Sequence, residues 1–73
     1  MAIQIIQALE EGDRTTTMPL AVVNGPLSFK IALYHKERIL AKQGFRVFEV
    51  FDEGRLVELQ AEKGNQKMRI YRI

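Results

Sequence analysis

Residues 45–73 restrict the fold of this chain more than any other segment, because they contain three apolar runs separated by glycine-containing breaks. Phe45–Phe51 places apolar side chains on both faces of an extended strand. Arg55–Glu62 and Lys67–Ile73 alternate apolar with polar residues, which is typical of strands with one buried face. Each break contains a glycine, which favours the positive φ of a hairpin turn. The pattern predicts a three-stranded antiparallel meander.

Within this meander the alternation also predicts which side chains are buried. In the second run the predicted inward residues are Val57, Leu59 and Ala61. In the third run Met68 and Ile70 are predicted to face inward, and the outward residues are Lys67, Arg69 and Tyr71.

The N-terminal part of the chain predicts one further strand. Ala2–Leu9 is rich in isoleucine and runs into the polar segment Glu10–Asp13, as a strand that ends at a turn does. We expect the segment from Asp13 to Pro26 to be a loop, with Pro19–Val23 as an alternative strand. The threonines at 15–17 fit an exposed strand, a loop or phosphoacceptor sites equally well.

Residues 27–43 decide the fold class, because two periodicities compete there. As a helix, the segment has Ser28 as its N-cap and Gly44 just beyond its end. The apolar face of this helix would consist of Phe29, Ala32, Leu33, Ile39 and Leu40. As a strand, apolar residues alternate with others up to Leu33, and the upstream Asn24-Gly25 resembles a hairpin turn. We favour the helix, since residues 32–43 contain no turn signal. Lys36 lies within the apolar face, where only its long stem can reach water.

These elements predict an α+β domain made of a strand, a loop, a single helix and a three-stranded antiparallel meander. An all-β small barrel is the alternative, if residues 27–43 form strands. The chain has 73 residues and a mass of 8.4 kDa, which is enough for a single domain over residues 1–73. It has no cysteine, so packing and hydrogen bonds must stabilise it without disulfides.

The reactive side chains are too few to indicate an enzyme. The chain has one histidine, His35, and one serine, Ser28. We expect His35 to be an ordinary surface residue and Ser28 to cap the helix. The acidic residues within 10–13 lack the ligand spacing of a calcium loop. The glycines are isolated, unlike those of a phosphate-binding loop. We expect no catalytic residue, no metal site and no cofactor.

Charge and hydropathy favour a cytoplasmic protein with no membrane segment. The longest apolar stretches are far shorter than the roughly 20 residues of a membrane span. The N-terminus lacks the basic and apolar regions of a secretory signal, and the absence of cysteine agrees with a reducing compartment. The net charge is +2, but residues 27–73 carry ten basic and six acidic side chains.

Two groups of residues are candidates for binding a partner. On the helical interpretation, the face opposite the apolar one consists of Leu27, Ile31, Tyr34, Arg38 and Lys42. Either the loop over residues 13–26 covers Ile31 and Tyr34, or this face docks a partner through tyrosine and arginine anchors. The last strand interleaves cations with an aromatic residue, which suits single-stranded nucleic acid or an acidic protein surface. The predicted partner-binding residues are Ile31, Tyr34, Arg38, Lys42, Lys67, Arg69 and Tyr71.

The order of these elements resembles that of small phage-encoded proteins that bind and disable host machinery, including inhibitors of host RNA polymerase and some anti-CRISPR proteins. The junction Gly44-Phe45-Arg46-Val47 is similar to the junction in a podophage polymerase inhibitor. The resemblance implies a stoichiometric binder of a host protein. We therefore expect a non-enzymatic, protein-binding regulator of host transcription or defence, with a nucleic-acid-binding regulator as the alternative.

Overall fold

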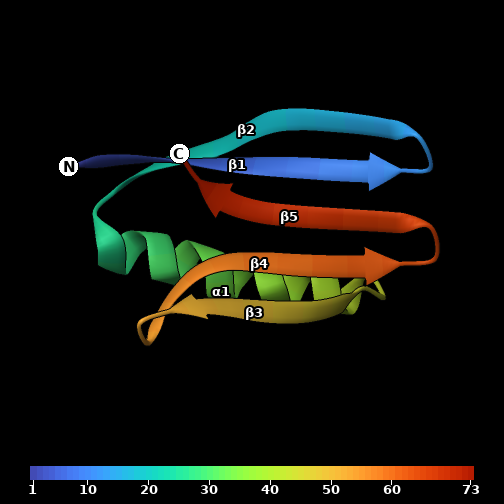
Figure 1. Cartoon of the computed structure of the whole chain (residues 1–73). Coiled ribbons are helices and arrows are strands. Elements are labelled where there is room, and N and C mark those ends of the chain that lie inside the picture. Colours follow the sequence, from blue (N-terminus) through green and yellow to red (C-terminus); the bar gives the residue numbers. More distant parts are fainter.

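The structure, a computed structural model that describes residues 1–73, is an α+β domain with one antiparallel sheet and a single helix (Figure 1). Its elements are β1 (Ala2–Glu11), β2 (Arg14–Asn24), α1 (Pro26–Lys42), β3 (Arg46–Asp52), β4 (Arg55–Lys63) and β5 (Gln66–Arg72). The five strands lie in the order β2-β1-β5-β4-β3. The predicted α+β class is confirmed, and residues 27–43 do not form the strands of a barrel.

The predicted C-terminal meander is confirmed, because β3, β4 and β5 pair in sequence as antiparallel neighbours. β5 occupies the centre of the sheet, where it also pairs with β1. The turn between β3 and β4 has positive φ at both Glu53 (51°) and Gly54 (77°). Two positive φ values are the signature of a type I′ turn, whose twist matches that of the strands it joins.

The prediction of a loop over residues 13–26 is wrong, because residues 14–24 form β2, an edge strand paired with β1. The alternative strand, Pro19–Val23, lies within β2. The tight turn at Gly12 (φ 60°) brings the two strands together, and the β-branched threonines at 15–17 suit an extended backbone. Pro19 is tolerated because an edge strand has one side without ladder hydrogen bonds. A register shift beside Leu20 interrupts the pairing next to this proline.

The predicted helix is confirmed, but its N-cap lies three residues earlier than expected. Gly25 (φ 112°) is the N-cap residue and Pro26 opens the first turn, where a missing N–H costs nothing. Ser28, predicted as the cap, lies inside the helix and makes no capping hydrogen bond. At the other end Gly44 (φ 92°) follows the helix as predicted. The backbone N–H of Phe45 donates to the carbonyl of Leu40 at 3.0 Å, which completes a Schellman motif.

The hydrophobic core lies between α1 and one face of the sheet. Figure 1 shows the helix crossing behind β3 and β4, and it also contacts β1 and β2. The buried cluster consists of Ile3, Ile5, Phe29, Leu33, Leu40, Leu56, Leu59, Ala61, Met68 and Ile70. The predicted core residues Ala32 and Ile39 are only partly buried, as is Lys36. No buried residue is polar or charged.

One predicted core position in β4 is wrong. Val57 is only half-buried, because the pairing of β4 with β3 skips it: Val50 pairs with Glu58, and Phe51 pairs with Leu56. Such a bulge shifts the alternation by one residue. Leu56, which was not among the predicted inward residues, therefore occupies the core and is 6% exposed.

No helix in the structure is both long enough and apolar enough to cross a membrane.

Candidate functional site

The predicted binding residues fall on two opposite surfaces of the molecule. The helix covers one face of the sheet, so its outward side forms one surface, and the uncovered face of the sheet forms the other. Ile31, Tyr34, Arg38 and Lys42 belong to the helix. Lys67, Arg69 and Tyr71 alternate with the buried Met68 and Ile70 on β5, and therefore lie on the uncovered face. The structure does not bring the two groups together into one site.

The outer helix face, formed by Leu27, Ile31, Tyr34, Arg38 and Lys42, is open to solvent. Leu27 is 70% exposed, Ile31 is 60% exposed and Tyr34 is 36% exposed. The expectation that residues 13–26 cover Ile31 and Tyr34 is wrong, because residues 14–24 are held in the sheet as β2. The helix therefore presents aliphatic side chains that no other part of the chain covers.

A groove runs beside this face, between the N-terminal half of α1 and the turn that joins β3 and β4. Its volume is about 580 Å³, and Leu27, Tyr34 and Phe51 line it. Phe51 is 52% exposed and was not predicted as a site residue. Phe51 reaches the groove because of the bulge in β4, which pairs Phe51 with Leu56 on the helix side of the sheet. The apolar surface therefore extends from the helix onto the sheet edge.

The helix is also the basic part of the molecule. Residues 26–42 carry four basic side chains and one acidic side chain, whereas the rest of the chain carries seven basic and eight acidic ones. The whole excess of positive charge is thus on the helix, at +3 against −1 elsewhere. The ammonium of Lys30 lies 6.0 Å from the ring centroid of Tyr34, at the outer limit of a cation–π contact.

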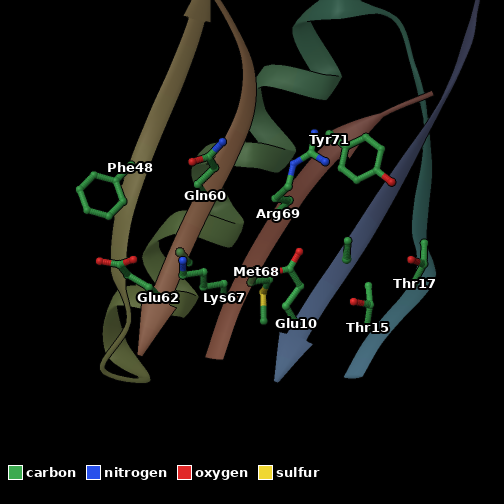
Figure 2. A pocket seen from close by; sticks show the side chains of 12 residues that line it. Glu10, Thr15, Thr17, Phe48, Gln60, Glu62, Lys67, Met68, Arg69 and Tyr71 are labelled. Carbon is green, nitrogen blue, oxygen red and sulfur yellow. The ribbon is translucent and has the colours of Figure 1, made fainter. Parts of the chain in front are cut away.

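The open sheet face, as we call the uncovered face, consists of three rows that cross the strands. The first row, from β2 to β3, is Thr15, Glu10, Lys67, Glu62 and Arg46. The second is Thr17, Ala8, Arg69, Gln60 and Phe48, and the third is Pro19, Ile6, Tyr71, Glu58 and Val50. This face has a hollow of about 640 Å³, lined mainly by the first two rows. Figure 2 shows the side chains that line it.

A polar network fixes the centre of the open sheet face. The guanidinium of Arg69 donates to both carboxylate oxygens of Glu58, at 2.9 Å and 2.8 Å, and the amide of Gln60 donates to Glu58 at 2.8 Å. The Arg69 guanidinium also lies 4.7 Å from the Tyr71 ring centroid. The hydrogen bonds from Arg69 hold the pKa of Glu58 below its ordinary value, although partial burial opposes them.

The open sheet face is neutral, with three cations and three carboxylates among its rows. The predicted residues Lys67 and Arg69 are cross-strand neighbours of acidic or amide side chains, and Glu58 already engages Arg69. A phosphate backbone that approached this face would meet carboxylates between the cations. The sequence did not reveal this balance, because the acidic residues come from β1 and β4 and the cations from β3 and β5.

A pair of carboxyl groups joins α1 to the edge strand β3. The pKa of Glu37 is raised above its ordinary value, first by partial burial and further by the neighbouring carboxyl group of Glu49. No third ligand is near, since no three histidine, cysteine, aspartate or glutamate residues are grouped closely enough to hold a metal ion.

No family model matches this chain, and neither a curated protein nor a solved structure matches it significantly. The resemblance to phage-encoded inhibitors therefore stays a prediction, and function has to be argued from the two surfaces.

Proposed function

We propose that this chain is a non-enzymatic binding protein that docks an acidic, partly apolar protein surface onto its outer helix face. The observation that carries the proposal is the exposure of Leu27 and Ile31 on the one element that bears the positive charge of the molecule. Exposed aliphatic side chains that lie together on a folded surface are typical of interaction sites.

The spacing on the helix suits recognition by a groove in the partner. Leu27, Ile31, Tyr34 and Arg38 are separated by three or four residues, so they form one stripe along α1. Recognition of a helix in a groove uses anchors at this spacing. Burying an aliphatic side chain stabilises a complex by about 1.5–3 kcal/mol, and tyrosine and arginine are enriched among strong interface anchors.

The cations around the stripe favour an acidic partner. Lys30, Arg38 and Lys42 accelerate association with a negatively charged surface and disfavour a basic one. A protein surface also accounts for the aliphatic residues, which make no use of a phosphate backbone. Nucleic acid is the alternative partner for the basic helix, and it would show itself by a gel shift at about 50 mM salt that is lost steeply as salt rises.

The resemblance to phage-encoded inhibitors supports one class of partner, the transcription or defence machinery of a bacterial host. Bacterial RNA polymerase is the first protein to test on this ground. In such a role the chain acts stoichiometrically, as a small inhibitor that occupies a surface of its target and catalyses nothing.

Charge reversal on the helix tests the docking surface. The Arg38→Glu and Ile31→Asp variants should weaken binding to purified bacterial RNA polymerase, or to a protein captured and identified from a bacterial lysate, by at least about tenfold. The matched controls are Arg14→Glu and Val22→Asp, since both positions are exposed and lie on β2. Both controls should bind like the original protein.

Two results would overturn the proposal. One is the absence of any stoichiometric protein partner together with turnover of a small substrate. The other is an identified partner whose affinity, measured by calorimetry at low salt, is unchanged by Arg38→Glu and Ile31→Asp.

A further inference from the structure

The open sheet face is a large surface without a covering layer. The molecule exposes 5151 Å², whereas a compact monomer of this mass exposes about 4,600 Å². The helix covers only one face of the five strands, and sheets are normally packed on at least one further layer wherever they carry apolar side chains. Phe48, on the open sheet face, is 44% exposed.

The charges of the first row alternate across the sheet. From β1 to β3 they are Glu10, Lys67, Glu62 and Arg46, and cross-strand pairing fixes this order. The midpoint of the row lies between β5 and β4. Lys67 and Glu62 lie at equal distances on either side of this midpoint and have opposite charges, and so do Glu10 and Arg46. The row is therefore complementary in charge to a reversed copy of itself.

Consider two copies packed with their open sheet faces together. A two-fold axis midway between the two sheets, parallel to the strands and above the gap between β4 and β5, brings these opposite charges together. It places β5 of one copy opposite β4 of a second copy, and β1 opposite β3. Lys67 then faces Glu62 of the second copy, and Glu10 faces Arg46 of the second copy. An axis that runs through β5 itself would instead place Lys67 against Lys67.

The same axis brings together complementary shapes in the other rows. In the second row Phe48 faces Ala8 of the second copy, at the position where the short alanine side chain leaves the hollow open. In the third row Ile6 lies opposite Val50 of the second copy, but Ile6 is only 7% exposed within one chain, so this pair adds little contact area. Aligned sheets pack about 10 Å apart with interleaved side chains, which a large residue opposite a small one permits.

We propose that two copies of this chain associate through their open sheet faces about this axis, with Phe48 of each copy seated over Ala8 of the other. The helices then lie on the two outer sides of a four-layer dimer. The proposal is independent of the proposed function, because it uses the opposite face of the molecule. Arg38→Glu should therefore leave the dimer unchanged.

The size of the face sets the expected affinity. Four strands about 4.8 Å apart and three rows about 6.8 Å apart give about 400 Å² of flat sheet in each copy. Stable complexes bury about 800 Å² per partner, so this face is at the low end. We expect a dissociation constant of about 10–100 μM, the range of weak and reversible dimers.

Sedimentation equilibrium of the whole chain tests the proposal directly. The original protein should approach twice its mass of 8.4 kDa as its concentration rises to about 1 mM. Lys67→Glu and Glu62→Lys should each weaken self-association by at least about tenfold, because each creates two like-charge contacts across the axis. A mixture of the two variants should recover dimers, since each reversed charge then faces its opposite.

The recovery by mixing distinguishes contacts between copies from contacts within one copy. Lys67 and Glu62 are also cross-strand neighbours within one chain, so each single variant has a like-charge pair of its own. Mixing does not remove those pairs, and any recovery has to come from the interface. Arg14→Glu, which changes an exposed charge outside the open sheet face, is the control.

A second pair of variants tests the apolar contact. Phe48→Ala should weaken the dimer, whereas Phe51→Ala should not, although both residues lie on β3 and are similarly exposed, at 44% and 52%. They differ in that Phe51 lies on the helix side of the sheet. Far-UV circular dichroism confirms that each variant remains folded.

Three results would overturn the proposal. A mass of 8.4 kDa at every concentration would exclude the dimer. A dimer unaffected by Lys67→Glu and Phe48→Ala would place the interface elsewhere, such as the β2 edge. Weakened single variants that fail to associate when mixed would exclude the two-fold axis.

Discussion

Glu53 has the least favourable backbone conformation in the chain. It is the only non-glycine residue with positive φ, at 51°, and it occupies the first central position of the β3–β4 turn. A side chain with a Cβ atom costs about 1 kcal/mol in this conformation, and asparagine tolerates it better than glutamate. The strain comes from the choice of residue, because the turn itself requires the positive φ.

Glu53→Asn should therefore stabilise the protein by about 0.5–1 kcal/mol. The free energy of unfolding, obtained from urea titration, measures this gain. Asn65→Gly is the matched control in the next turn, where Asn65 does not have positive φ. The control should lose stability, since glycine adds freedom to the unfolded chain without relieving strain. A gain in the control equal to that at position 53 would contradict the explanation.

The two perturbed carboxyl groups should give opposite dependences of stability on pH. Because the pKa of Glu37 is raised in the folded protein, protonation of Glu37 stabilises the fold when the pH is below the ordinary pKa of 4.5. This stabilisation is lost as the pH rises through the raised pKa. Glu37→Gln should therefore be more stable than the original protein at pH 7, and the difference should disappear in acid, where Glu37 is protonated in both the folded and the unfolded state.

Glu58 provides the opposite case. Its pKa is lowered, so its contribution is present above 4.5 and is lost as the pH falls through the lowered value. Glu58→Gln should be less stable than the original protein at pH 7, and the difference should shrink in acid. Urea midpoints across the acidic range check both signs. A constant difference at every pH, for either variant, would show that titration is not its cause.

At the scale of the element, the helix makes Leu33 and Ile31 differ, whereas a strand over the same residues would place both on one face. Leu33 is fully buried and Ile31 is 60% exposed. Leu33→Ala should cost about 2–5 kcal/mol, a large part of the roughly 4–11 kcal/mol expected for a domain of this size. Ile31→Ala should change stability by no more than about 0.5 kcal/mol. Urea midpoints for the two variants measure the contrast, and equal large losses would contradict the helix.

The elements that the sequence predicted well are those with local signals. Alternation and turn glycines predicted the meander and the first strand, and Gly44 predicted the end of the helix. The helix start was missed because Pro26 and Gly25 determine it by backbone geometry, which outweighed the capping ability of Ser28. β2 was predicted only as an alternative, through Pro19–Val23 and the threonines at 15–17, because an edge strand needs little apolar periodicity. Thr15 and Thr17 face solvent and rely on pairing with β1. The bulge at Val57 coincides with the adjacent apolar residues Leu56 and Val57, but the alternation alone does not decide which of the two is buried.

At the scale of the whole molecule, the candidate residues were predictable but their grouping was not. The exposed side of a helix follows from its own periodicity, so the outer helix face could be assigned from residues 27–42 alone. The open sheet face depends on strand order and register between distant segments. Glu10 lies beside Lys67 only because β1 pairs with β5. The neutral, alternating character of that face is therefore a property of the fold, and the basic appearance of β5 in the sequence was misleading about its surroundings.

The central position of β5 also has a consequence for how the protein is made. The β1–β2 hairpin and the unit of α1, β3 and β4 are joined in the sheet only through β5, which pairs with both. Because β5 follows all the other elements in the chain, it leaves the ribosome after them. Until it does, the edges of β1 and β4 remain unpaired on a nascent chain, and the core residues Met68 and Ile70 are missing. Folding of the sheet is thus postponed until β5 has been synthesised, and in the meantime the unpaired edges are targets for chaperones or for misassembly with other chains.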